Sequence, residues 1–134
     1  STEEEDQGET VDRSYWEQKA SKSSLELVDE VIRLDQEVEP GLEAKFNKHY
    51  VGLASHGLAR NLLSFRPRKQ HIIAEFSIPR SDPLTTRLDE SPLDMLPYDS
   101  RFKNYRIRLV ASDRQEHREE LLNLIQRASD AYGR

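Results

Sequence analysis

The chain has 134 residues, of which 35% are hydrophobic and 34% are charged, and it contains no cysteine. This length suits one domain around one core, and the missing cysteine excludes disulfides, thiolate metal sites and thiol catalysis. No apolar stretch approaches the ~20 residues of a membrane span, and no signal segment is present, so we expect a cytoplasmic protein without a membrane partner.

The net charge of −5 combines two regions of opposite sign. Residues 1–44 contain 14 acidic and 4 basic residues, whereas residues 45–108 contain 6 acidic and 12 basic residues. A basic region attracts phosphate groups, but single-sign clusters are also common on ordinary surfaces. The basic middle of the chain therefore predicts either a phosphate-binding surface or a solvated sheet face.

The first 13 residues are acidic and have a single aliphatic side chain, so we expect a disordered linker over residues 1–13 and one domain over residues 14–134. Ser14 and Glu17 have the spacing of a capping box, which predicts a short helical turn. This turn carries Trp16, which we interpret as a plug on the core.

A second capping box, Ser23 to Glu26, precedes an amphipathic helix. Apolar residues recur at helical spacing from Leu27 to Val38, and Pro40-Gly41 ends the pattern. A further helix is expected after Ser112, with an apolar stripe that ends at Tyr132.

Four strands are expected between these helices. They cover His49–Ala54, Arg60–Arg66, Gln70–Ile78 and Tyr105–Ala111. The segment Pro79–Asn104 holds four of the six prolines, which predicts a long loop with one short helix near residues 84–88.

Alternation along the last two strands predicts a buried face that carries Ile72, Ala74, Phe76, Ile78, Tyr105, Ile107 and Leu109. The expected fold is α+β, a two-layer sandwich with a mostly antiparallel four-stranded sheet. The N- and C-terminal helices cover one face of that sheet, and the other face stays open.

Catalytic patterns are absent from the sequence. It has no Gly-x-Ser-x-Gly elbow, no glycine-rich phosphate loop and no HxH or HExxH motif, so we expect no enzyme activity, no metal and no cofactor. His49 and His71 fit ordinary surface histidines better than metal ligands. Glu43-Ala-Lys45 matches half of a restriction-type nuclease signature, and we interpret it as a chance tripeptide in a connector.

Five cations are the candidate binding residues. Arg66, Arg68 and Lys69 surround the predicted hairpin turn, and Arg106 and Arg108 project from the open side of the last strand. Such cations can bind a phosphate backbone or an acidic protein surface, or they can simply protect a sheet edge. Few aromatic residues alternate with them, so base stacking is expected to add little.

The pattern from Leu25 to Tyr132 resembles a bacterial domain family of unknown function labelled "predicted transport protein". The resemblance is carried by LELVDEVIRLDQEVEP, KHYVGL, RNLLSFRPRKQHIIAEFSIP and YRIRL, by Asp82-Pro83, and by the final helix. It implies a YdhG-like α+β fold and a C-terminal position behind a restriction-endonuclease-like nuclease or another DNA-linked domain. Family members commonly have a glycine-bearing turn where this chain has residues 100–104.

These observations favour a non-catalytic accessory module of a bacterial nucleic-acid-acting protein. It would be the C-terminal part of a longer chain, with an N-terminal domain as one partner. Its basic sheet face would bind nucleic acid weakly, or an acidic protein surface. The alternative is a module for protein–protein interaction or oligomerisation that makes no contact with nucleic acid.

Overall fold

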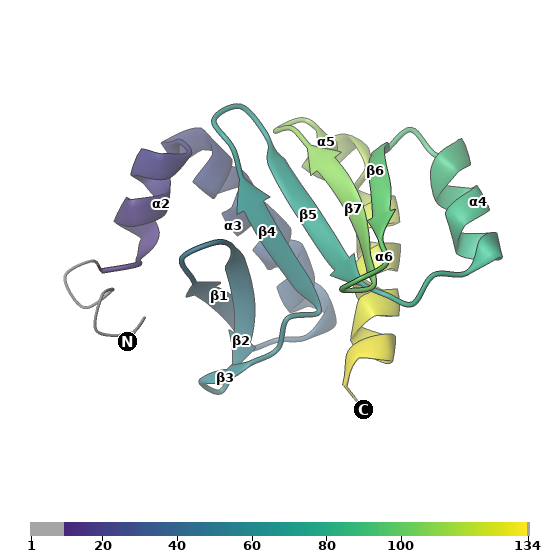
Figure 1. The fold of residues 1–134 in the computed structure, drawn as a ribbon, viewed down its shortest axis with the longest axis horizontal. Coiled ribbons are helices and arrows are strands. Elements are labelled where there is room, and N and C mark those ends of the chain that lie inside the picture. Colours follow the sequence, from purple (N-terminus) through teal and green to yellow (C-terminus); the bar gives the residue numbers. More distant parts are fainter. Residues whose placement is uncertain (1–9, 134) are drawn as a thin grey trace.

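The computed structural model describes residues 10–133, which contain five helices and seven strands in one antiparallel sheet (Figure 1). The helices are α2 (Arg13–Lys19), α3 (Lys22–Val38), α4 (Asp82–Glu90), α5 (Asp113–Glu116) and α6 (Arg118–Tyr132). The strands are β1 (Leu42–Phe46), β2 (Val51–Ser55), β3 (Leu58–Ala59), β4 (Leu63–Pro67), β5 (Ile72–Ser77), β6 (Asp94–Asp99) and β7 (Asn104–Leu109). Most of the predicted linker, residues 1–9, lies outside the described residues, while Arg13 already belongs to α2.

The first two helices begin two residues earlier than the capping boxes predict. Asp12 caps α2 by accepting a hydrogen bond from the Tyr15 amide at 3.0 Å. Ser21 caps α3 in the same way, through the Ser24 amide at 3.1 Å. Both residues have the three-residue spacing that a cap requires, and capping at the earlier position lengthens each helix. Trp16 is buried between these elements and the start of the sheet, as predicted.

The strand order is β1-β2-β4-β5-β7-β6, and β3 pairs with β2. Every pair is antiparallel, so the predicted α+β class and antiparallel sheet are confirmed. The predicted count of four strands is wrong: β1 lies in the expected connector, β6 lies in the expected long loop, and the two-residue β3 falls between the expected strands His49–Ala54 and Arg60–Arg66. Both β1 and β6 are edge strands. β1 alternates between inward and exposed residues but is only five residues long and directly follows Pro40-Gly41, whereas β6 has no buried residue and lacks clear alternation. An edge strand also tolerates the proline at position 97.

One face of the sheet is covered by helices. Figure 1 shows α3 and α6 behind the strands; α3 packs on β1, β4 and β5, and α6 packs on β5. The strand residues of this face are buried as the alternation predicts: Ile72, Ala74, Phe76, Ile78, Tyr105, Ile107 and Leu109. The opposite side, turned toward the viewer in Figure 1, carries no helix of the described chain, and we call it the open face.

The segment between β5 and β7 is more regular than the predicted loop. Ser81 caps α4, which extends the expected short helix, and β6 then pairs with β7. A tight turn joins β6 to β7, in which the Asp99 carboxylate accepts hydrogen bonds from the amides of Arg101 and Phe102 at 3.0 and 3.2 Å. Lys103 has φ of 58°, a left-handed conformation that glycine adopts more easily. The turn thereby holds Phe102 at the edge of the open face.

Candidate binding site on the open sheet face

The strand register brings three predicted cations to the open face. Glu75 of β5 lies between Ser64 and Arg106, and Ile73 lies between Arg66 and Arg108. These two rows cross β4, β5 and β7 on the side away from Phe65, Ala74 and Ile107, which are all fully buried. Side chains two residues apart on a strand share a face, so all six residues of the rows lie on the open side.

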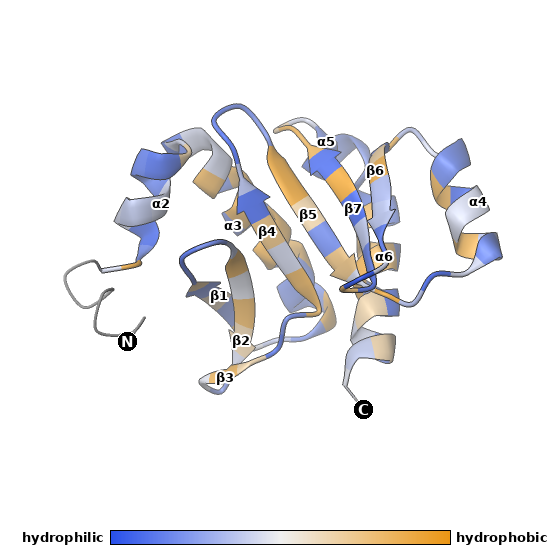
Figure 2. Ribbon diagram, viewed as in Figure 1, coloured by the Kyte–Doolittle hydropathy of each residue, from blue (hydrophilic) through white to orange (hydrophobic). Residues whose placement is uncertain are grey.

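The hairpin cluster divides into two parts. Arg66 was expected at the tip of the turn, but it lies within β4 and points across the sheet. Arg68 and Lys69 do lie in the turn between β4 and β5, which Figure 2 shows as a hydrophilic loop at the top of the view, and both are exposed. The turn is attached to the helical layer, because Ser21 Oγ donates to the Lys69 carbonyl oxygen at 2.7 Å.

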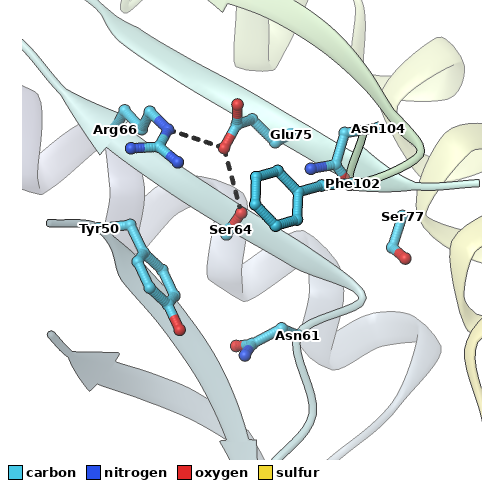
Figure 3. A pocket seen from close by; sticks show the side chains of 8 residues that line it. All are labelled: Tyr50, Asn61, Ser64, Arg66, Glu75, Ser77, Phe102 and Asn104. Atoms are coloured by element: carbon cyan, nitrogen blue, oxygen red, sulfur yellow. Dashed lines mark hydrogen bonds and ion pairs between the residues drawn. The ribbon is translucent and has the colours of Figure 1, made fainter. Parts of the chain in front are cut away.

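Glu75 is the central charge of this face. Its carboxylate accepts a hydrogen bond from Arg66 Nε at 2.9 Å (Figure 3) and another from Arg106 Nε at 2.8 Å. Ser64 Oγ lies 3.5 Å from the same carboxylate, and Glu75 is only 3% exposed. One buried carboxylate thus orients two guanidinium groups and neutralises part of their charge. The sequence placed Glu75 on the less buried side of its strand but gave no reason to select it.

The remaining positive charge concentrates where β7 ends beside the β4–β5 turn. Arg108 Nη1 lies 3.8 Å from Asp94 Oδ2, and both side chains are about half exposed, so this pair compensates little. Burial lowers the pKa of His71, and the neighbouring charges of Arg108 and Arg68 lower it further, against a weaker effect of Asp94. His71 therefore stays neutral at neutral pH, next to arginines that raise the local potential.

A cavity of about 270 Å³ lies on the open face beside Glu75. It is lined by Tyr50, Asn61, Ser64, Arg66, Glu75, Ser77, Phe102 and Asn104, and we call it the sheet pocket. Figure 3 shows the Phe102 ring reaching from the β6–β7 turn toward Ser64, with Tyr50 farther along the face. Sequence analysis did not select either aromatic residue for this face: Phe102 comes from a turn, and Tyr50 precedes β2, so neither alternates with the cations along a strand.

The polar lining of the sheet pocket leaves several groups unused. Asn61 Oδ1 accepts a hydrogen bond from the Leu53 amide at 2.9 Å, so its NH₂ group remains as a donor. The side chains of Ser77 and Asn104 make no hydrogen bond within the described part of the chain. Asn61 approaches β2 at Gly52, where a Cβ atom would lie 2.3 Å from Asn61 Oδ1. Only glycine permits this contact.

Comparison with known proteins assigns no family. No family model matches the chain, and no curated protein and no solved structure matches it either. The resemblance to the "predicted transport protein" family stays a prediction. The functional argument therefore depends on the geometry of the open face.

One group of side chains in the described chain has metal-ligand geometry. Ligand atoms of Asp113, Glu116 and His117 lie within 4.8 Å of one another, and His117 Nε2 is 3.4 Å from Asp113 Oδ1. Asp113 and Glu116 belong to the short helix α5 and His117 directly follows it, and none of the three lines the sheet pocket. Glu43 and Lys45, the nuclease-like pair, are exposed on the edge strand β1. Within residues 10–133, no helix is long and apolar enough to span a membrane.

Proposed function

We propose that this chain is a non-catalytic module that binds nucleic acid through its open sheet face. The observation that carries the proposal is the joint position of the predicted cations. Arg66, Arg106 and Arg108 lie on one uncovered face, and Arg68 and Lys69 extend the positive charge beyond its end. Phosphate groups are recognised by arginine and lysine side chains in such arrangements.

The charges on this face predict weak binding. Glu75 compensates the Arg66 and Arg106 pair in part, which leaves Arg68, Lys69 and Arg108 as the cations most able to neutralise phosphates. Three phosphate contacts on a single strand give a slope of about −2 in a plot of log K against log salt concentration. We expect a dissociation constant in the range of non-specific binding, about 10⁻⁴–10⁻⁶ M at physiological salt.

The test is a fluorescence anisotropy titration of labelled dodecathymidylate at several salt concentrations. The double variant R68E/R108E is expected to weaken binding at least about tenfold, because it reverses two of the three least compensated cations. The matched control is R33E/R127E, which makes the same change in net charge on exposed positions of α3 and α6. The control is expected to bind like the parent apart from a small general charge effect.

Two results would overturn the proposal. The first is no binding by the parent protein at about 100 μM and low salt, since about 100 μM is the weak end of the usual range for non-specific contacts and low salt only strengthens them. The second is equal loss in R68E/R108E and R33E/R127E, since that would show a response to net charge alone. Either result would favour a protein–protein interaction module.

A further inference from the structure

Phe102 is a large hydrophobic side chain held in solvent beside a cavity. It is 61% exposed, and its backbone is fixed by the Asp99 hydrogen bonds and by the left-handed Lys103. The guanidinium carbon of Arg101 lies 5.0 Å from the ring centroid. An exposed ring on a fixed backbone can stack on a planar ligand with little loss of backbone freedom. Aromatic side chains on open sheets serve this purpose for unpaired bases.

The floor of the sheet pocket matches the edge of a base. Asn61 offers a free NH₂ donor, while Asn104 and Ser77 each offer a donor and an acceptor that no described residue uses. Side-chain amides pair well with the donor and acceptor pattern of bases. The volume of about 270 Å³ lies just below the ~300–1,000 Å³ of drug-sized sites, so it suits one ring system.

The arginines beside the pocket are placed for the phosphates next to such a base. Arg66 lines the pocket and is fixed at Nε by Glu75, and Arg106 is fixed by the other oxygen of the same carboxylate. Each guanidinium is held at only part of its donor fork, and both side chains are about one third exposed. A base within a duplex cannot enter such a pocket, since its edge is paired and its faces are stacked.

We infer that the sheet pocket holds one unpaired base of a single-stranded nucleic acid, stacked on Phe102 and hydrogen-bonded by Asn61 and Asn104. This inference rests on the proposed function and adds the class of ligand. Affinity then has two parts: a phosphate part that depends on salt, and a base part that depends on Phe102.

The experiment compares three labelled probes with equal phosphate counts per strand: dodecathymidylate, a dodecamer of abasic sites, and a duplex that contains the thymidine strand. The parent protein is expected to bind dodecathymidylate about tenfold more tightly than the abasic strand, from one stacked base. Phe102→Ala is expected to remove that difference, and Phe102→Trp to restore it. Because Phe102 is exposed, its removal leaves the core intact. Leu58→Ala, which removes another exposed hydrophobic side chain, is the control and keeps the difference.

The possible failures can be told apart. Equal, salt-dependent binding of the thymidine and abasic strands overturns the base pocket and leaves phosphate binding in place. A preference for bases that persists in Phe102→Ala, or tighter binding of the duplex, also overturns the base pocket. No binding of any probe overturns both the inference and the proposed function.

Discussion

Replacing Asp35 by leucine is expected to stabilise the fold at neutral pH. Asp35 lies on α3 and is fully buried, and neither carboxylate oxygen has a hydrogen-bond partner among the described residues. Burial raises the pKa of Asp35 well above its usual value, and the nearby charge of Glu39 adds to the shift. In the folded chain Asp35 is therefore either a buried charged carboxylate or a buried neutral carboxyl whose O–H has no acceptor. Both states lower the free energy of unfolding.

The size of the effect follows from this missing partner. A buried polar group without a hydrogen bond costs about 1–3 kcal/mol in mutational data. Leucine matches aspartate in the number and branching of its heavy side-chain atoms and has no polar atom, so Asp35→Leu is expected to raise the free energy of unfolding by about 1–3 kcal/mol at neutral pH. Asp35→Asn keeps the shape but removes the charge, so its gain is expected to be smaller.

The pH dependence gives a second, independent check. Because the pKa of Asp35 is raised in the folded state, its contribution to stability is fully present below the unfolded pKa of about 3.9. That contribution is lost as the pH rises toward the folded pKa. Glu39 behaves in the opposite way, since its hydrogen bonds from Arg60 lower its pKa and its contribution is lost only as the pH falls. Glu39 is present in both the parent and Asp35→Asn, so the difference in stability between these two proteins isolates Asp35.

Urea unfolding followed by the fluorescence of Trp16, the single and buried tryptophan, measures both effects. The exposed acid Glu26 on the same helix supplies the control, and Glu26→Gln is expected to leave stability within about 0.5 kcal/mol of the parent. An Asp35→Leu variant no more stable than the parent would refute the reasoning. So would a stability difference between parent and Asp35→Asn that does not grow as the pH rises above the unfolded pKa of about 3.9.

Three further predictions concern the open face. Glu75→Gln removes the negative charge shared by two arginines, so thermal unfolding should show a free energy of unfolding lower by about 1–3 kcal/mol. Anisotropy should show tighter oligonucleotide binding, because the positive charge of the arginines is no longer offset, and weaker binding would contradict this. Gly52→Ala should displace the Asn61 side chain and lower the free energy of unfolding by about 1–3 kcal/mol. A variant with the parent's urea midpoint would show that Asn61 moves aside without loss of stability. Bound dodecathymidylate should raise the pKa of His71 in an NMR titration, since phosphates offset the arginine charges that help to lower it; an unchanged value would place the ligand elsewhere.

The buried faces of the strands and helices could be predicted from the sequence alone, through the local periodicity of apolar residues. The alternation of Ile72, Ala74 and Phe76 reports the buried face of β5, because successive side chains of a strand point to opposite sides. The same rule placed Arg106 and Arg108 on the open face. The apolar stripes of the two long helices follow from the 3.6-residue repeat.

Edge strands and caps were decided by tertiary structure. β6 has no buried residue and no two-residue repeat, so only its pairing with β7 identifies it as a strand, whereas β1 alternates but spans only five residues after Pro40-Gly41. The caps at Asp12 and Ser21 compete with later residues of equal chemistry, and the choice depends on contacts beyond the helix. Ser21 illustrates this, because its hydroxyl also donates to the distant Lys69 carbonyl oxygen.

The candidate site was likewise beyond the reach of the sequence. Glu75 meets Arg66 and Arg106 only because β5 lies between β4 and β7 in this register, and a shift of one residue would turn the carboxylate into the core. The sheet pocket joins residues from Tyr50 to Asn104, including an aromatic ring from a turn. Alternation determined on which side of the sheet each strand residue lies. Strand pairing decided which of these residues meet, because the contacts between strands are non-local and are not encoded in any short segment of the chain.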